Sequence, residues 1–332
     1  MPSLLSIAAV SVPFVLTLIA LPWWIKRAKK HGFVGKDMNK YGHPEVAELG
    51  GLIAVPSAVI GILLYVALQV FVYHTGAHTV ILLAAVCSLL IAALIGFADD
   101  LLGWKIGLRQ SQKVILSALI ALPMMVINAG TSTMHVPFIG KVTFGLLYPL
   151  VIVPLAIIFS ANAFNMLAGY NGLEAGLGII ALSALGGIAW LSGGKLAAVI
   201  AACIVTSLIA FILPNWYPAR IFPGNAFTYA VGAAIAIVAI VGNIEKYALI
   251  VFIPFIIEFL LKARGRFQKE SFAQPMSNRS LTQQYQEWYS LPHVALSFLS
   301  LCTKKPNERQ AVSLLLLFEL LCAGAALALF LY

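Results

Sequence analysis

The sequence predicts an all-α integral membrane protein with about ten transmembrane helices and both termini outside the cytoplasm. Three observations lead to this fold class. Hydrophobic residues make up 61% of the 332 residues and charged residues only 10%, whereas a soluble domain carries about 25% charged residues. The apolar residues form runs close to the ~20 residues that a helix needs to cross the hydrocarbon of a bilayer. Alternate connections between these runs, with their immediate flanks, hold 18 of the 21 lysines and arginines.

Ten apolar runs are candidates for the spanning helices. Helices are expected because a spanning segment must satisfy its backbone hydrogen bonds internally. The first run has no Lys or Arg before it and no clear cleavage site, so we interpret it as a span rather than a signal peptide. In chain order the runs are 3–25, 50–73, 79–97, 112–128, 144–161, 173–191, 196–213, 225–242, 246–262 and 309–331.

The distribution of basic residues predicts the orientation of these spans. Only Lys141, Lys195 and Lys246 belong to the other set of connections between the runs. By the positive-inside rule, the loops that hold the other basic residues are cytoplasmic. These loops are 26–49, 98–111, 162–172, 214–224 and 263–308. The whole chain, 1–332, is then a single polytopic membrane domain, in which the longest loop could carry a small structure of its own.

Composition also argues against other classes of protein. The net charge of +9 is spread over loops between apolar runs, so it indicates membrane topology and no nucleic-acid partner. The four cysteines fit no zinc-binding spacing and imply no disulfide framework.

Two polar motifs on the predicted cytoplasmic side could carry chemistry. Asp99 and Asp100 end the third span. Adjacent carboxylates at a membrane boundary suit a divalent cation or a base beside one, although a solvated helix end is the alternative. The stretch 162–174 holds three asparagines and Glu174 among glycines. Amide oxygens can ligate Mg²⁺ and amide NH₂ groups can bind a base edge, and a polar turn is the alternative.

Other cytoplasmic residues give weaker signals. Phe222, on a Pro-Gly turn, could stack on a nucleobase or anchor the interface. Arginines favour bidentate contacts to phosphate, but charge that only sets the topology explains most basic residues equally well. His293 is a candidate phosphate contact. The basic candidates are Arg109, Lys113, Arg264 and Arg266.

Four motifs in this order resemble the polyprenyl-phosphate N-acetylhexosamine-1-phosphate transferases, and most closely their eukaryotic and archaeal dolichyl-phosphate branch. They run from Gly35-Lys36-Asp37-Met38-Asn39-Lys40 through Phe97-Ala98-Asp99-Asp100 and 162–174 to Asn215-Trp216-Tyr217-Pro218. The resemblance implies ten helices with a cytoplasmic active site, in the cell membrane or the endoplasmic reticulum membrane. It also implies transfer of N-acetylglucosamine 1-phosphate from a UDP-sugar to a polyprenyl phosphate, a Mg²⁺ requirement and a homodimer.

The resemblance further implies roles for individual residues. Asp99 and Asp100 match paired aspartates that act near the metal and the lipid phosphate. Asn165 matches an Mg²⁺ ligand, and Asn225 stands where the family has an aspartate ligand. The expected substrate contacts are Met38, Glu48, Asn171 and Phe222 toward the uridine, and Arg109, Arg264 and Arg266 toward the phosphates.

The position of Asn225 leads to a hypothesis about metal binding. An amide keeps one carbonyl oxygen of a carboxylate but loses its charge, and each lost carboxylate weakens the hold on a hard cation. Metal binding is therefore expected to be impaired, unless another residue compensates. The alternative function is a transporter of an anionic or lipid-linked solute, whose binding residues would lie near the bilayer midplane.

Overall fold

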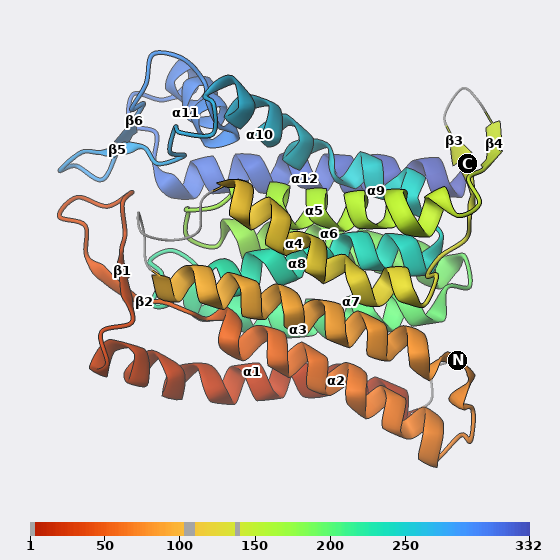
Figure 1. Cartoon of the computed structure of the whole chain (residues 1–332). Helices are drawn as coiled ribbons and strands as arrows, with labels where there is room; N and C mark the ends of the chain where they lie inside the picture. Colours follow the sequence, from red (N-terminus) through yellow and green to blue (C-terminus); the bar gives the residue numbers. More distant parts are fainter. Residues whose placement is uncertain (1–3, 103–109, 137–139) are drawn as a thin grey trace.

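The computed structural model describes residues 4–102, 110–136 and 140–332. Within these residues, eight helical segments are long and apolar enough to cross a membrane. They lie side by side with their long axes roughly aligned (Figure 1), which confirms the all-α membrane fold. They are α1 (Leu4–Lys30), α2 (Gly51–Phe71), α3 (Thr79–Leu102), η2 with α5 (Tyr148–Ile152 and Val153–Met166), α6 (Leu173–Leu191), α7 (Lys195–Asn215), α8 (Asn225–Gly242) and α12 (Glu308–Leu331).

The two remaining predicted spans differ from these eight segments. α4 (Gln110–Val126) is shorter than they are within the described residues. The continuous helix predicted over 246–262 is wrong, because α9 (Glu245–Val251) ends before α10 (Ile253–Arg264) begins. Pro254, in the first turn of α10, has no N–H to continue the hydrogen-bond ladder of α9. The count of ten spans stays a prediction.

Several helices extend beyond the apolar runs that predicted them. α3 continues to Leu102 and α5 to Met166. The predicted loop boundaries at 98 and 162 are therefore wrong, because a helix can keep its backbone hydrogen bonds after its side chains become polar. As a result, the Asp99–Asp100 pair and Asn165 sit on helices and not in loops.

Short antiparallel strand pairs lie at both ends of the bundle. β1 (Val34–Lys36) with β2 (Glu45–Ala47), and β5 (Gln274–Pro275) with β6 (Leu281–Thr282), lie at one end. β3 (Thr133–Val136) and β4 (Gly140–Thr143) lie at the other end, with the start of α1 and the end of α12 (Figure 1). The short helix η1 (Gly76–His78) precedes α3. The loop 263–308 carries β5, β6 and α11 (Leu291–Cys302), so it does form a small structure of its own.

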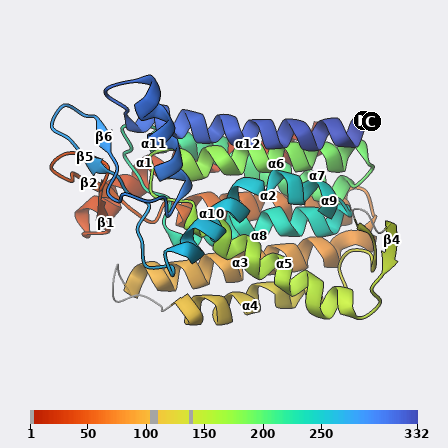
Figure 2. The ribbon, with the colours of Figure 1, turned by 90° about the horizontal axis from the view of Figure 1, so that it is seen from above.

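α8 lies at the centre of the bundle, with α3, α5 and α6 packed around it (Figure 2). From Ala226 to Ile240 every residue of α8 is buried. Glycines let neighbouring backbones approach α8, as small residues do in membrane helix pairs. A Cβ atom on Gly96 of α3 would lie 2.3 Å from the backbone carbonyl of Asn225, and one on Gly232 would lie 2.6 Å from the carbonyl oxygen of Ser160.

We expect Gly96→Ala to push α3 and α8 apart where the two aspartates meet α8. The added methyl would contact backbone and not a movable side chain, so overpacking should cost about 1–3 kcal/mol. A lower thermal unfolding temperature of the purified protein, together with lost activity, is the expected result. Gly187→Ala is the matched control, because a Cβ on Gly187 meets nothing within 4 Å. Equal unfolding temperatures for the two variants would contradict the prediction.

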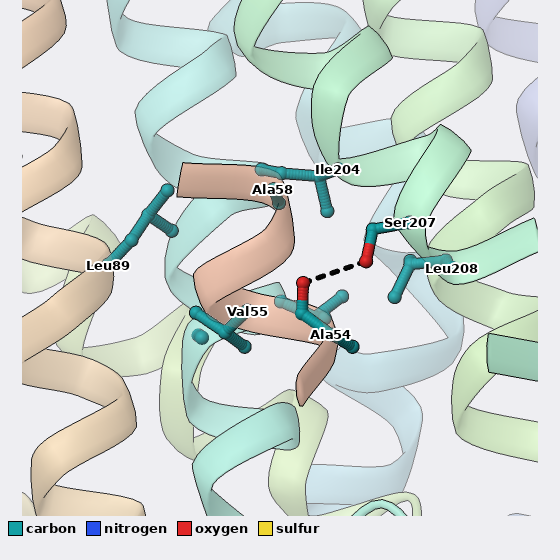
Figure 3. A pocket seen from close by; sticks show the side chains of 9 residues that line it. Ala54, Val55, Ala58, Leu89, Ile204, Ser207 and Leu208 are labelled. Carbon is teal, nitrogen blue, oxygen red and sulfur yellow. Dashed lines mark hydrogen bonds between the residues drawn. The ribbon is translucent and has the colours of Figure 1, made fainter. Parts of the chain in front are cut away.

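The interior between α2, α3, α7 and α8 is closely packed. A cavity there has a volume of about 10 Å³ and apolar walls (Figure 3). Ser207 beside it is hydrogen-bonded to the carbonyl oxygen of Ala54 at 2.7 Å and to the hydroxyl of Thr17 at 2.8 Å. The cavity is too small for a solute, since a single water already needs a comparable volume.

Candidate active site

Asp100 connects the end of α3 to the start of α8. Its carboxylate oxygens accept the backbone N–H of Asn225 at 2.8 and 3.0 Å and that of Ala226 at 3.3 Å. The residue that precedes α8, Gly224, has no side chain to cap it. The first N–H groups of a helix lack partners within the helix, and a negative charge there is favourable. Asp100 therefore caps α8 from a different helix.

Asp99 points to a second set of partners. Its Oδ2 lies 2.6 Å from the Nζ of Lys113 on α4 and accepts the Nδ2 of Asn225 at 2.8 Å. The Asp99 side chain is buried, with 3% of it exposed. A buried carboxylate is tolerated where it is paired and hydrogen-bonded. Asp99 thus brings together the ends of α3, α4 and α8.

Asn165 joins the same group through Thr228, one turn after the start of α8. The hydroxyl of Thr228 donates to the Oδ1 of Asn165 at 2.6 Å and lies 3.3 Å from the backbone oxygen of Asn225. The structure therefore brings together both predicted metal ligands and both aspartates. The link through Thr228 was missed by the sequence prediction, since a threonine inside an apolar run gives no signal.

The side chains around Asp99 fit a magnesium ion whose remaining ligands come from a substrate. Asp99 offers one carboxylate, and Asn165 and Asn225 offer two side-chain amides, of which Asn225 turns its Nδ2 toward Asp99 at 2.8 Å. In the described part of the chain, no three His, Cys, Asp or Glu side chains converge as a metal site. Mg²⁺ commonly takes one or two carboxylates, keeps several waters and binds substrate phosphates. The donor set is thus adequate only with phosphate oxygens added.

Glu48 and Phe222 lie on two segments that pair beside Asp100. The N–H of Phe222 donates to the carbonyl oxygen of Ala47 at 2.7 Å, and the carbonyl oxygen of Phe222 accepts the N–H of Gly50 at 3.0 Å. Phe222 remains half-buried. Burial raises the pKa of the Glu48 carboxyl above its usual value. These contacts place an aromatic ring and an acid on adjacent backbone segments.

Asn171, in the turn between α5 and α6, lies in a buried polar cluster. Its Oδ1 accepts the Nζ of Lys40 at 2.6 Å and the N–H of Ala219 at 2.7 Å. Its Nδ2 donates to Asp37 at 3.1 Å, and its backbone N–H donates to Glu308 at 2.8 Å. Lys40 also pairs with Asp37. An amide NH₂ has two hydrogens, so one remains for a ligand.

Met38 lies between two residues that hold the β1–β2 connection against this cluster. Asp37 belongs to the cluster itself. The Nδ2 of Asn39 donates to the carbonyl oxygen of Gly169 at 2.8 Å, and its Oδ1 accepts the N–H of Ala273 at 3.0 Å. The backbone of Met38 is therefore held near the turn that carries Asn171.

Among the described residues, the arginines predicted to contact phosphate do not join the groups around Asp99 and Asn171. Arg264 is half exposed and forms an ion pair with Glu287 at 2.9 Å. Its guanidinium also lies over the ring of Tyr289. Arg266 is exposed just after α10. Arg109 lies outside the described residues. Lys113, which the sequence indicated only as one of several basic candidates, contacts Asp99 directly.

His293 is wrong as a phosphate contact. The side chain is buried in α11, and its Nδ1 accepts the N–H of Tyr289 at 3.3 Å. Burial, and then the charge of Lys262, lower the pKa of His293 to about 4. The ring is thus neutral near pH 7 and supplies no positive charge to a phosphate.

Comparison with known proteins decides the family. The model of glycosyl transferase family 4 matches residues 82–243, which include Asp99, Asp100, Asn165, Asn171 and Asn225. A Saccharolobus solfataricus protein named "Putative UDP-N-acetylglucosamine--dolichyl-phosphate N-acetylglucosaminephosphotransferase" is 36% identical over 320 residues. That alignment covers 96% of this chain and 94% of the relative. The chain belongs to glycosyl transferase family 4.

Two relatives that align with a smaller part of this family 4 chain are named as two different transferases. A Dictyostelium discoideum UDP-N-acetylglucosamine--dolichyl-phosphate N-acetylglucosaminephosphotransferase is 28% identical over 74% of this chain and 68% of its own length. A Halalkalibacterium halodurans phospho-N-acetylmuramoyl-pentapeptide-transferase is 31% identical over 74% of this chain and 78% of its own length. The family resemblance predicted from the motifs is confirmed.

Proposed function

We propose that this family 4 chain transfers N-acetylglucosamine 1-phosphate from UDP-N-acetylglucosamine to a polyprenyl phosphate of the dolichyl type, releasing UMP, in lipid-linked oligosaccharide synthesis. The observation that carries the proposal is the contact chain Asn165–Thr228–Asn225–Asp99 beside Asp100, at one end of a membrane bundle. The name of the archaeal relative, which aligns with 96% of this chain, supports this pair of substrates.

The reaction is an exchange of one phosphorus–oxygen bond. An oxygen of the lipid phosphate attacks the β-phosphorus of the nucleotide sugar, and the bond from that phosphorus to the bridging oxygen breaks. The bridging oxygen leaves with UMP, and the product is a lipid diphosphate sugar. Two anions must approach each other, so positioning and positive charge supply most of the catalysis.

The side chains near Asp99 have distinct roles in this proposal. Mg²⁺, held by Asp99, Asn165 and Asn225, would neutralise charge on the phosphates. Lys113 adds a positive charge 2.6 Å from Asp99. Asp100 keeps the start of α8, and therefore Asn225, in register with α3.

The nucleotide is proposed to bind between the segments that carry Asn171 and Phe222. The remaining Nδ2 hydrogen of Asn171 suits a carbonyl oxygen of uracil, and the half-buried Phe222 ring suits its flat face. The backbone at Met38 and the carboxyl of Glu48 complete the uridine site. Arg109, Arg264 and Arg266 remain candidates for the phosphates and the lipid. By the charge distribution, this site faces the cytoplasm.

A transporter is not supported. The elements that carry the candidate site residues meet at the end of the bundle where β1, β2, β5 and β6 lie (Figure 1), and not at its middle. Glu319, the carboxyl inside α12, is fully buried among other helices. The cavity beside Ser207 holds no solute of useful size.

The test of the proposed function is a reconstitution assay. Protein in detergent should release UMP only when UDP-N-acetylglucosamine, a polyprenyl phosphate and Mg²⁺ are all present. Chelation of Mg²⁺ should stop the release. UMP release without the lipid phosphate would show a UDP-sugar hydrolase instead, and a panel of UDP-sugars and polyprenols tests the substrate pair.

Asn225→Asp should raise activity at low Mg²⁺ concentration. The aspartate would be a second carboxylate ligand beside Asp99 and would bind a hard cation more strongly. The expected result is an apparent Mg²⁺ constant about tenfold lower, equivalent to about 1.4 kcal/mol. Activity is measured against Mg²⁺ concentration for both proteins. The idea fails if the aspartate form is no more active at any Mg²⁺ concentration.

A further inference from the structure

α11 lies across the bundle instead of along it. Figure 2 shows α11 running across the long axis of α12, at the end of the bundle that carries β1, β2, β5 and β6. It packs against α12 and α10. A carboxylate on α10 fixes its start: Glu258 accepts the hydroxyl of Ser290 at 2.7 Å and the N–H of Leu291 at 2.6 Å. α11 is thus held in the plane that a membrane surface would occupy.

One face of α11 is apolar and is not covered by the described chain. Leu296 and Ala295 are buried toward the protein. Val294, Phe298 and Leu301 follow the spacing i, i+4 and i+7, which places them on one stripe. Phe298 is 54% exposed and Leu301 86% exposed. A helix with one buried face and an exposed apolar stripe of this kind needs a second apolar environment.

The position of α11 along the chain puts this stripe beside the bilayer. α12 is a membrane-span candidate that begins at Glu308, and only 303–307 separate it from α11. Six steps of chain reach at most about 20 Å. The connection is also tied back, since the N–H of Leu281 donates to the carbonyl oxygen of Pro306 at 2.8 Å. Leu301 therefore lies close to the start of a spanning helix.

Charge and aromatic residues around the stripe match an anionic lipid surface. Lys304 and Lys305 are exposed directly after α11. Trp288 is 45% exposed and its Nε1 donates to the hydroxyl of Ser297, beside the stripe. Tryptophan is enriched at membrane–water interfaces, and lysines near the surface are attracted to anionic headgroups.

We propose that α11 is an interfacial helix that binds the lipid surface at this end of the bundle. Phe298 and Leu301 lie below the headgroups, and Lys304 and Lys305 lie among anionic lipid phosphates. Helices of this type lie in the interface plane with their apolar face buried in it. This surface is separate from the nucleotide and metal groups of the proposed active site, and it does not depend on which substrates are used.

The segment that carries α11 also contacts the candidate active site. The N–H of Ala273 donates to Asn39, which in turn donates to Gly169, next to the turn of Asn171. Glu308, just after the connection, accepts the N–H of Asn171. Binding of α11 to lipid would therefore steady the segments that surround the nucleotide.

The test uses full-length protein reconstituted into vesicles. A background without the four native cysteines receives a single bimane-labelled cysteine at position 298, 301 or 300. Ser300 is exposed but lies two residues from Phe298, on the opposite side of the helix, and is the matched control. Vesicles contain phosphatidylcholine alone or equal parts phosphatidylcholine and phosphatidylglycerol. Retained UMP release or an unchanged unfolding temperature verifies that each labelled protein is folded.

The expected result in mixed vesicles is a difference between the two sides of α11. Brominated lipid should quench labels at 298 and 301 about threefold more than the label at 300, and aqueous iodide should show the reverse order. Lys304→Gln with Lys305→Gln should reduce this difference in mixed vesicles but not in phosphatidylcholine alone. Equal iodide quenching at all three positions would overturn the proposal. So would protection of 298 and 301 from both quenchers, which would indicate a protein partner or a second copy of the chain.

Discussion

Asp99→Asn should lower kcat/KM for UMP release by roughly 10²–10³-fold, as expected when a group that positions transition-state charge is lost. The variant keeps an oxygen next to Lys113 and Asn225 but removes the only carboxylate among the three proposed metal ligands. Steady-state kinetics with UDP-N-acetylglucosamine and polyprenyl phosphate measures the change. The apparent Mg²⁺ constant should rise at the same time.

A second variant separates this chemical role from stability. Asp99→Asn leaves the partly exposed ammonium of Lys113 without its counter-charge, so the loss of stability should stay below the about 3–5 kcal/mol that breaking a fully buried pair costs. Adding Lys113→Gln removes that charge, so the double variant should recover much of the unfolding temperature but none of the activity. Recovery of activity together with stability would show that Asp99 only supports the fold.

Asp100→Asn is the internal comparison. Both carboxylate oxygens of Asp100 accept N–H groups of α8, and an amide can offer only one oxygen in their place. The expected loss of stability is about 1–2 kcal/mol, as for other helix caps. Activity should fall less than in Asp99→Asn.

Glu308→Ala should weaken nucleotide binding and lower stability. The change leaves the backbone N–H of Asn171 without its acceptor, which costs about 1–3 kcal/mol for a buried group. Lys40 also loses an anion at 3.5 Å. Because Asn171 is proposed to bind uracil, KM for the UDP-sugar should rise about tenfold, equivalent to about 1.4 kcal/mol, while kcat changes little.

Two controls define this result. Glu287→Ala breaks the exposed pair with Arg264, and exposed pairs contribute only about 0–1 kcal/mol, so both KM and stability should stay near their original values. Glu308→Gln keeps an acceptor for Asn171 but loses the charge beside Lys40, so its KM should lie between those of the original protein and Glu308→Ala. An unchanged KM in Glu308→Ala would exclude the cluster from nucleotide binding.

Local sequence determined the fold class and most of the candidate site. Long apolar runs must leave water together and must satisfy their backbone within each run, so composition alone predicted membrane helices. Charge asymmetry grouped the polar loops, and the described parts of those loops lie at one end of the bundle (Figure 1). Asp99, Asp100 and the Asn165 region were recognisable because polar groups at a membrane boundary are costly without a role.

The tertiary structure decided which partner each of these groups has. Asp100 caps a helix whose first residue is 125 positions away, and Glu308 accepts an N–H 137 positions away. No local pattern encodes such pairs, because they depend on how α3, α8 and α12 pack. The same holds for the direction of α11, which lies across the bundle (Figure 2). The apolar composition determined which segments are buried in lipid or protein. The direction in which α11 runs, and the partner of each polar side chain, were decided only by how the helices pack.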